Sequence, residues 1–344
     1  MVQLAEAWDT LLSTEVAEAA WVPLPAAAAA ARGEPSPFAP FMPIDASPGA
    51  YRGFWEALGA RFDEAGAPPR VDDVSRGGAS TGDLRARVAA YAPVPIAADL
   101  ASLPPRERVA LRHAVAAARA VSTAYGEQLW AGVGPLLGEL DATAAAAPGD
   151  EHAALLARYA RINGGPWSAL GGGAAFVGAG PVVAVPQRDG TAVRVVLPVP
   201  RRQPPSGAFY PPGASAAEVR AWLEGLPAGP ARAAAGGYFT RVVRRADGGL
   251  DAVPYSEAHA GPLRDAAGHL RALAAATTDG PLAAFAASRA GALESNEYAA
   301  SDADWLALGA RDEAGGGPPR LDLTIGPYET YADGLMGLKA TFEA

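Results

Sequence analysis

The four histidines are the side chains of this sequence with the most specific chemistry, because imidazole nitrogens are common ligands of transition metals. They lie at positions 113, 152, 259 and 269. None is followed by Glu and then by a second His four residues further on, the helical spacing that places two imidazoles and a general base on one face. The sequence therefore predicts that all four are surface or half-buried residues and that this chain binds no metal.

His259 and His269 need a separate test, because both fall within one predicted helix, residues 256–276. Their separation in the sequence puts the two side chains roughly 100° apart around the helix axis and about 15 Å apart along it. Two residues so placed cannot bind the same ion from a straight helix.

A second set of candidates surrounds a predicted strand near the C-terminus. Residues 321–325 alternate apolar and polar side chains, which is the period of a half-buried strand, and the pair Gly326-Pro327 interrupts this alternation. Polar side chains lie on this strand and just beyond its end, and the family resemblance given below makes these positions the best candidates for lining a substrate cleft. The candidate site residues are Asp322, Thr324, Gly326, Glu329 and Tyr331.

A helix is predicted after this strand, because Leu335, Leu338 and Phe342 recur at intervals that place them on one helical face. Glu329 and Tyr331 lie between the strand and this helix, and two interpretations of the pair stay open. The side chains either line a substrate cleft or only stabilise the turn that leads into the helix.

Four carboxylates between residues 294 and 304 raise the alternative of a cation site. Helix capping and a solvated helix face explain them more simply, and the helix dipole favours an acid in a first helical turn. These carboxylates belong to Glu294, Glu297, Asp302 and Asp304.

The composition is that of a globular protein of one large or two moderate domains. Apolar residues make up 50% of the 344 residues and charged residues 19%, so the chain can bury a sizeable core. The formal net charge of -9 argues against a nucleic-acid partner, because such proteins neutralise phosphates with clustered basic side chains. The absence of cysteine excludes disulfides, thiolate metal sites and a cysteine nucleophile.

Neither a secretory leader nor a membrane anchor is expected. Residues 1–20 lack a basic segment and carry four acidic side chains. The longest apolar run, residues 21–31, is about half of what a bilayer requires. A cytoplasmic protein without a membrane partner is therefore expected.

Helices are predicted at several places in the first half of the chain. Apolar periodicity predicts amphipathic helices over residues 1–20 and 51–65. The longest helix should begin at Pro104-Pro105, since proline suits a first helical turn. A further helix over residues 150–161 should end at Gly164-Gly165-Pro166.

Strands appear only in the second half. Two β-hairpins are predicted where β-branched runs flank Asp-Gly turns, one over residues 174–185 and 191–197, the other over residues 239–245 and 250–254. Between them, Ser215 and Glu218 predict a capping box that starts a helix. After them, helices are predicted over residues 256–276, over residues 281–298 and from Ser301. This order predicts an α+β protein with a mainly helical region, 1–157, and an α+β region, 158–344.

Short blocks of the second half resemble the dipeptidyl peptidase III family of zinc metallopeptidases. The clearest is Ile-Gly-Pro-Tyr-Glu-Thr-Tyr at 325–331, followed by Gly-Leu-Lys-Ala at 337–340 and Phe-Glu-Ala at 342–344. Further blocks are similar to the family in order and spacing, at 161–167, 208–212, 252–258 and 298–305. The resemblance extends from about residue 158 to residue 344 and is weak before it.

The resemblance implies a two-lobed parent fold in which substrate peptides dock beside the strand at 321–325 by strand-like pairing. The family's zinc site is a His-Glu-x-x-Gly-His or His-Glu-x-x-His helix with a later Glu, and this sequence contains neither. Zinc is therefore expected as a cofactor of a full-length parent and not of this chain. In such an enzyme a zinc-bound water attacks the peptide, a Glu acts as base, and acidic groups hold the ammonium of the peptide.

Two functions follow as hypotheses. The chain is either the N-terminal part of a dipeptidyl peptidase that releases dipeptides from short peptides, or a stand-alone, non-catalytic peptide-binding or interaction protein derived from that family. On the first hypothesis the chain ends before the zinc-binding helices and is inactive alone, and its partner is the missing C-terminal catalytic part of the same polypeptide. A reading frame that continues after codon 344 would favour the first hypothesis, and a stop codon the second. An unrelated hydrolase that uses Glu and Asp ranks last, because only unpaired carboxylates support it.

Overall fold

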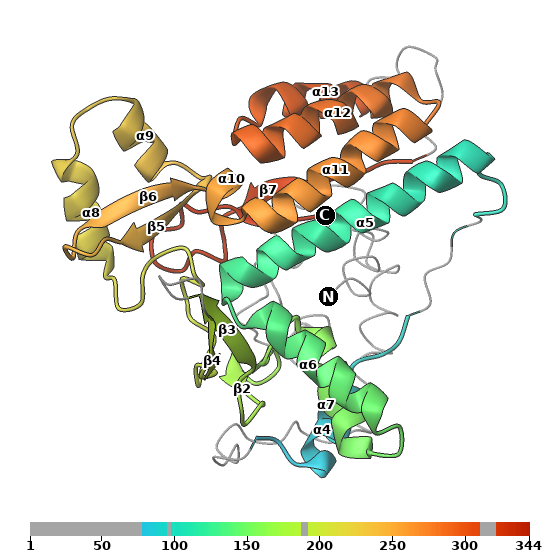
Figure 1. The fold of residues 1–344 in the computed structure, drawn as a ribbon, viewed down its shortest axis with the longest axis vertical. Helices are drawn as coiled ribbons and strands as arrows, with labels where there is room; N and C mark the ends of the chain where they lie inside the picture. The colour runs from blue at the N-terminus through green and yellow to red at the C-terminus, as the bar shows by residue number, and fades with distance from the viewer. Residues whose placement is uncertain (1–77, 95–97, 99, 187–191, 310–320) are drawn as a thin grey trace, which may run out of the picture. The chain divides into compact units, whose positions relative to one another are not determined.

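The computed structural model gives the fold of the chain as two compact units (Figure 1). It describes residues 78–94, 98, 100–186, 192–309 and 321–344. The first unit takes the described residues up to Ala97 and Pro135–Gln203, and the second takes Ala98–Gly134 and Pro204–Ala344. The sequence did not predict that the units would interleave along the chain, and its division at residue 157 stays a prediction. The helices predicted over residues 1–20 and 51–65 lie outside the described residues.

Helices and short strand pairs build the first unit. They are α4 (Thr81–Ala89), most of α6 (Val133–Ala146), α7 (Glu151–Asn163), the pair β1 (Trp167–Ser168) and β2 (Ala174–Ala175), and the pair β3 (Val182–Pro186) and β4 (Ala192–Val196). The predicted boundaries of α7 are confirmed. The Asp150 carboxylate accepts from the backbone N–H of Ala153, and Gly164 ends the helix with a φ of 63°.

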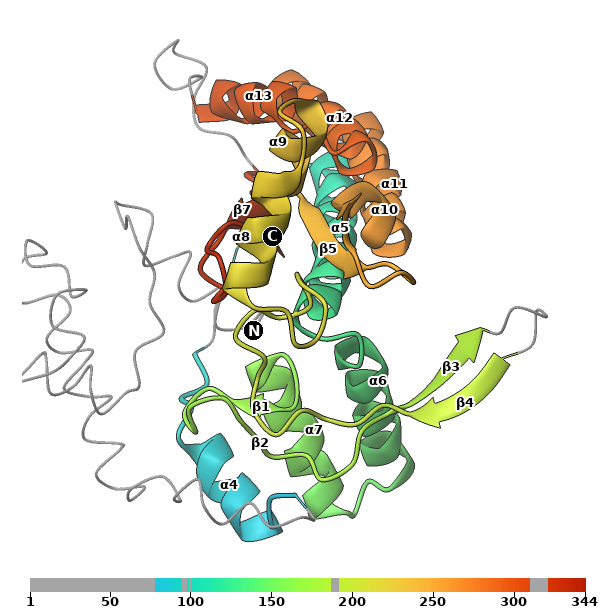
Figure 2. The ribbon, with the colours of Figure 1, turned by 90° about the vertical axis from the view of Figure 1, so that its left-hand side faces the viewer.

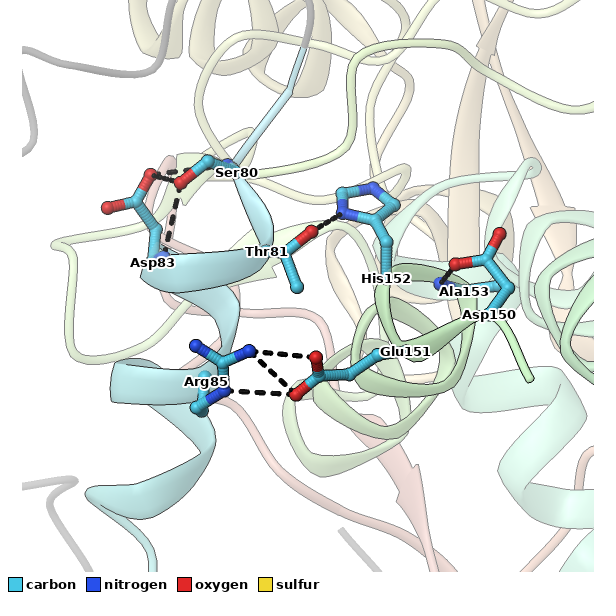
Figure 3. A network of polar contacts seen from close by, with 8 residues as sticks. All are labelled: Ser80, Thr81, Asp83, Arg85, Asp150, Glu151, His152 and Ala153. Atoms are coloured by element: carbon cyan, nitrogen blue, oxygen red, sulfur yellow. Dashed lines mark hydrogen bonds and ion pairs between the residues drawn. The ribbon is translucent and has the colours of Figure 1, made fainter. Parts of the chain in front are cut away.

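Polar contacts join the N-terminal ends of α4 and α7 (Figure 3). The Arg85 guanidinium donates to both carboxylate oxygens of Glu151, with a shortest distance of 2.8 Å, and the Thr81 hydroxyl lies 3.1 Å from Nδ1 of His152. More than half of each side chain of the Arg85–Glu151 pair is exposed, so this ion pair adds little stability. His152 is therefore part of a contact between two helices.

Both predicted hairpins are present. In the first unit, β3 and β4 pair antiparallel from Val182 opposite Val196 to Pro186 opposite Ala192, and their turn lies outside the described residues. The first strand was predicted too long, because Ala174 and Ala175 pair with β1 instead. In the second unit, β5 (Thr240–Arg244) and β6 (Leu250–Pro254) form the other hairpin.

Four helices form the main stack of the second unit (Figures 1 and 2): α5 (Pro105–Leu129), α11 (Ala260–Ala276), α12 (Gly280–Ser295) and α13 (Ala299–Gly309). α11 packs against both α5 and α12, and α12 packs against α13. α5 begins at the predicted proline pair. The Arg106 guanidinium donates to the carbonyls of Ala275 and Ala276, so the start of α5 lies at the end of α11 and the two helices run antiparallel.

The helix predicted over residues 256–276 is divided at His259 into α10 (Tyr255–Ala258) and α11. Pro262 gives the physical reason, because proline has no N–H for the carbonyl of Ala258 and its ring clashes with that carbonyl in a continuous helix. The predicted exposure of His259 is also wrong. Its side chain is buried, and Nδ1 lies 2.7 Å from a carboxylate oxygen of Glu127.

Two shorter helices, α8 (Ala216–Gly225) and α9 (Pro230–Gly236), complete the second unit. Ser215 caps α8 as predicted, because its hydroxyl accepts from the N–H of Glu218. The Glu218 carboxylate binds Arg244 at 2.8 Å, and this contact lowers the pKa of Glu218. Within the described residues, no helix has the length and apolar character needed to cross a bilayer.

The C-terminal segment differs most from the prediction. Side chains of residues 321–325 alternate in exposure as predicted, but these residues form no strand. The strand β7 (Gly326–Glu329) begins where a break was predicted, and it pairs antiparallel with β8 (Thr341–Glu343). The predicted C-terminal helix is therefore wrong, because a turn and a strand take its place.

The buried carboxylate of Asp333 explains why this segment is not a helix. Its oxygens accept from four backbone N–H groups, those of Leu335, Met336, Leu338 and Lys339, at 2.9 to 3.1 Å. They also accept from the hydroxyl of Tyr210 at 2.8 Å. A side chain that binds nearby N–H groups competes with helix formation. Gly337, which has a φ of 67°, completes the turn that leads to β8.

The side chain of Gln128 attaches β8 to α5. Its amide nitrogen donates to the carbonyl of Ala340, and its amide oxygen accepts from the N–H of Phe342 at 2.8 Å. The amide thus takes the place that a neighbouring strand would have beside β8. Gln128 is buried, so the loss of either contact would leave a buried polar group unpaired.

Lys339 fixes the same turn from another direction. Its ammonium group donates to the carbonyls of Ala235 and Gly237 and to the hydroxyl of Thr240, at 2.7 to 2.8 Å. Burial lowers the pKa of Lys339 to about 8, although the charge of Asp333 acts in the opposite direction. This lysine is a structural residue of the second unit.

Arg289 lies beneath the start of β7. The side chain is 1% exposed, Nη2 lies 2.5 Å from Asp302, and the guanidinium carbon lies 5.5 Å from the centroid of the Tyr328 ring. Gly326 has a φ of 154°, and a Cβ added there would lie 2.7 Å from Nη1 of Arg289. Only glycine therefore suits this position.

We expect Asp333→Ala to lower the free energy of unfolding by about 3 to 4 kcal/mol, because four backbone N–H groups and one hydroxyl lose a buried acceptor. Urea denaturation of the 344-residue chain measures this loss. Asp322→Ala is the control, since that carboxylate is exposed and, among the described residues, accepts only from the N–H of Leu323, and it should change stability by less than about 0.5 kcal/mol. Equal losses in the two variants would contradict the role of Asp333.

Gly326→Ala should lower the free energy of unfolding by about 1 to 3 kcal/mol, because alanine is strained at this φ and its Cβ meets a guanidinium that cannot move away. Gly268→Ala is the matched control. Gly268 lies inside α11 with no atom within 4 Å of an added Cβ, so alanine should stabilise the chain there by up to about 1 kcal/mol. Thermal unfolding of the two variants should therefore shift in opposite directions.

Candidate functional site

The predicted site residues occupy β7 and the segments on both sides of it. Gly326 and Glu329 are the first and last residues of β7, and Tyr331 follows it. Asp322 and Thr324 precede the strand and are exposed. Within the described residues, no hydrogen bond or ion pair joins Asp322 or Thr324 to Glu329 or Tyr331. The five residues therefore share one segment, and only its later part forms a cluster.

That later part belongs to an acidic cluster, defined as Glu329, Tyr331, Glu343 and Tyr125. Partial burial raises the pKa of the Tyr331 phenol, and the charges of Glu343 and Glu329 raise it further because they repel a phenolate. Burial raises the pKa of Tyr125 in the same way, and Tyr331 and Glu343 add to that rise. Tyr331 therefore lies near both carboxylates, and Tyr125 lies near Tyr331 and Glu343.

Two members of the acidic cluster were missed in the sequence. Glu343 lies on β8, where a helix was predicted, and its charge acts on the phenols of Tyr331 and Tyr125. Tyr125 comes from α5, far away in the sequence. No local sequence pattern predicts that Glu343 or Tyr125 belongs to the site. Both residues reach it through tertiary contacts, the pairing of β7 with β8 and the packing against α5.

The acidic cluster can bind a cation. Two carboxylates accept hydrogen bonds from an ammonium group and attract its charge, while phenols that stay protonated donate hydrogen bonds to a neighbouring acceptor. Tyr331 is 60% exposed, and the Glu329 side chain is also exposed, so a ligand can reach them. The Glu329 carbonyl accepts from the Thr341 hydroxyl at 2.8 Å, which fixes the backbone beside the cluster.

Within the described residues, one edge of β7 is not paired with another strand. One edge of β7 is occupied by β8, and no other strand of the described residues pairs with β7. An extended peptide that adds to such an edge gains main-chain hydrogen bonds. Two members of the acidic cluster, Glu329 and Tyr331, lie at the end of β7 and just beyond it.

The histidines do not match the zinc site that the resemblance implies. His152 contacts Thr81, His259 contacts Glu127, and the imidazoles of His113 and His269 contact each other. No group of three or more His, Cys, Asp or Glu residues that could hold a metal occurs in the described part of the chain. These residues therefore do not fit the zinc ligands of the family.

The four carboxylates considered as a cation site have separate partners or none. Glu294 binds Arg271 through both oxygens, and this contact lowers the pKa of Glu294. Asp302 binds Arg289. Glu297 is exposed and Asp304 half-buried, and neither joins a metal-binding group within the described residues. Ion pairs hold Glu294 and Asp302, where helix capping and a solvated face were expected from the sequence.

A serine nucleophile is also not assembled. Residues 78–82 read Gly-Ala-Ser-Thr-Gly, the Gly-x-Ser-x-Gly pattern of many serine hydrolases. The Ser80 hydroxyl instead caps α4, where it accepts from the N–H of Asp83 and donates to its carboxylate (Figure 3). The nearby imidazole, that of His152, contacts Thr81 and not Ser80. This motif therefore serves as a helix cap.

Solved structures of dipeptidyl-peptidase III share the fold of this chain. The structure from Corallococcus sp. strain EGB has a TM-score of 0.59 and 32% identity, and the match covers 80% of this chain and 43% of that one. The structure from Caldithrix abyssi has a TM-score of 0.60 and 27% identity, with 75% and 42% covered. No family model matches the sequence.

A curated protein of Arabidopsis thaliana, named Nudix hydrolase 3, is 32% identical over 289 residues, which cover 76% of this chain and 36% of that protein. The name describes a different hydrolase, and most of that protein lies outside the match. The name therefore gives no activity for the matched residues.

The chain thus spans between about a third and less than half of the length of each protein that it matches. Within that span, the helices and antiparallel strand pairs confirm the predicted α+β class, and the solved structures confirm the resemblance noted in the sequence blocks. The chain has a dipeptidyl peptidase III-like fold and resembles that family of peptidases.

Proposed function

We propose that this chain is the N-terminal part of a zinc-dependent exopeptidase of the dipeptidyl peptidase III type, which releases dipeptides from the N-termini of short peptides. The likeness to two dipeptidyl-peptidase III structures supports this most strongly, because it covers 75 to 80% of this chain but only 42 to 43% of theirs. The proposal includes the cytoplasmic location expected from the sequence.

In this proposal the second unit supplies peptide binding and no catalytic group. The free edge of β7 would pair with the backbone of the peptide, and the carboxylates of Glu329 and Glu343 would hold its N-terminal ammonium group. Tyr331 would donate a hydrogen bond to the same end of the peptide. The proposal assigns the zinc ligands and the general base to a further part of the parent polypeptide.

We expect the 344-residue chain alone to show no dipeptidyl peptidase activity, because its described residues lack a set of zinc ligands with a general base. Release of a chromophore from a dipeptidyl-arylamide, measured with added Zn²⁺ and again with a chelator, tests this expectation. Chelator-sensitive cleavage by the purified chain would show that the proposed division of roles is wrong.

A complementary experiment, in which activity is expected, uses the coding sequence that follows codon 344. If that frame continues and contains the zinc motif, the joined protein should cleave the same substrate. If the frame stops, or the joined protein is inactive but the chain binds short peptides, the non-catalytic peptide-binding protein becomes the better description.

Glu329→Gln in the joined protein should lower kcat/KM by about 10- to 100-fold, because a charged hydrogen bond to the substrate ammonium is lost. The loss should vanish for a peptide with an acetylated N-terminus, which carries no charge. Glu297→Gln is the matched control, since that exposed carboxylate lies outside the acidic cluster, and its kcat/KM should change less than about twofold. A similar loss of kcat/KM for both variants, or for both peptides, would show that Glu329 does not bind the substrate ammonium group.

A further inference from the structure

His113 and His269 face each other between the two longest helices of the second unit. His113 lies on α5 and His269 on α11, and their Nδ1 atoms are 3.4 Å apart although the residues are 156 positions apart in the sequence. Their ring centroids are separated by 5.7 Å and the ring planes are tilted by 35°. No other hydrogen bond of either imidazole occurs within the described residues.

The two helices hold this pair in place. Arg106 binds the carbonyls at the end of α11 on one side of the pair, and Glu127 binds His259 just before the start of α11 on the other. Ala110 and Ala117 lie on the same face of α5 as His113 and are fully buried. On α11, Ala266 and Leu273 take the same positions relative to His269 and are also buried. Both imidazoles are half-buried at the border of the core, where solvent reaches them.

The separation of the two nitrogens matches that of two ligands on one tetrahedral ion. Zinc–nitrogen bonds of 2.0 to 2.1 Å at a tetrahedral angle place the two nitrogens about 3.3 to 3.4 Å apart. In the present arrangement the nitrogens point toward each other, so one neutral imidazole can donate to the other. A turn of each ring about its χ2 torsion, which has a broad energy minimum, aims both lone pairs at one ion.

We propose that His113 and His269 form a binding site for a divalent metal ion that accepts tetrahedral nitrogen ligands, such as Zn²⁺ or Co²⁺. Each neutral imidazole then keeps its proton on Nε2 and binds through Nδ1. No third His, Cys, Asp or Glu residue joins the pair within the described residues, so water or an added ligand takes the other positions. The bound ion clamps α5 to α11. This proposed site differs from the expectation drawn from the sequence, which was a chain without metal.

Zinc titration of the 344-residue chain, followed by isothermal calorimetry, tests this proposal. His113→Gln and His269→Gln should each weaken the binding of one Zn²⁺ by at least about tenfold, because each removes one of two protein ligands. His152→Gln is the matched control, since it removes a half-buried histidine of the first unit, and it should bind Zn²⁺ like the unchanged chain. Circular dichroism of each variant verifies that it folds.

A second measurement needs no substitution. In long-range ¹H–¹⁵N spectra of the histidines, Zn²⁺ should shift the Nδ1 signals of two imidazoles together and leave the others unchanged. Because the bound ion stabilises only the folded chain, Zn²⁺ should also raise the melting temperature. Unchanged spectra at saturating Zn²⁺, or equal affinity of the unchanged chain and the His113→Gln/His269→Gln double variant, would overturn the proposal.

Discussion

A single buried carboxylate determines the course of the chain after β7. The oxygens of Asp333 collect four backbone N–H groups and the Tyr210 hydroxyl, so the turn that encloses them has few unpaired donors. Because this turn redirects the chain, Lys339 reaches its three acceptors and Gln128 reaches the backbone of β8. Without the carboxylate, the donors would be buried without partners and β8 would have no fixed path back to β7.

The acidic cluster depends on the return of β8 to pair with β7. Glu329 and Tyr331 stand at the end of β7, and Glu343 stands on β8 opposite Gly326, and the charges of both glutamates act on the Tyr331 phenol. The charges of Glu329 and Glu343 raise the pKa of the Tyr331 phenol, because they repel a phenolate. The proposed ammonium ligand would bring a positive charge to these negative groups.

The sequence predicted the elements whose boundaries are local and missed those that depend on distant partners. Pro104 and Gly164 mark helix ends, and an Asp-Gly turn marks the hairpin of β5 and β6, because each acts within a few residues. The apolar spacing of Leu335, Leu338 and Phe342 suggested a helix, but the competing acceptor Asp333 has no signature in a periodicity. Tyr125, Glu343 and the pair of His113 and His269 come together through tertiary packing, which spacing along the chain does not encode. The candidates Glu329 and Tyr331 were found through the resemblance, and the rest of their cluster through the structure.

The burial of Lys339 has a practical consequence for chemical modification. It is the only lysine of the 344 residues, its side chain is 1% exposed, and its amine is bound to three oxygens. Reagents that acylate amines therefore have no accessible lysine side chain on the folded chain. Acylation at this position requires the turn around Asp333 to open, so the extent of labelling, read by mass spectrometry, records how often that opening occurs. The chain thus carries an internal reporter of the segment that holds its candidate site.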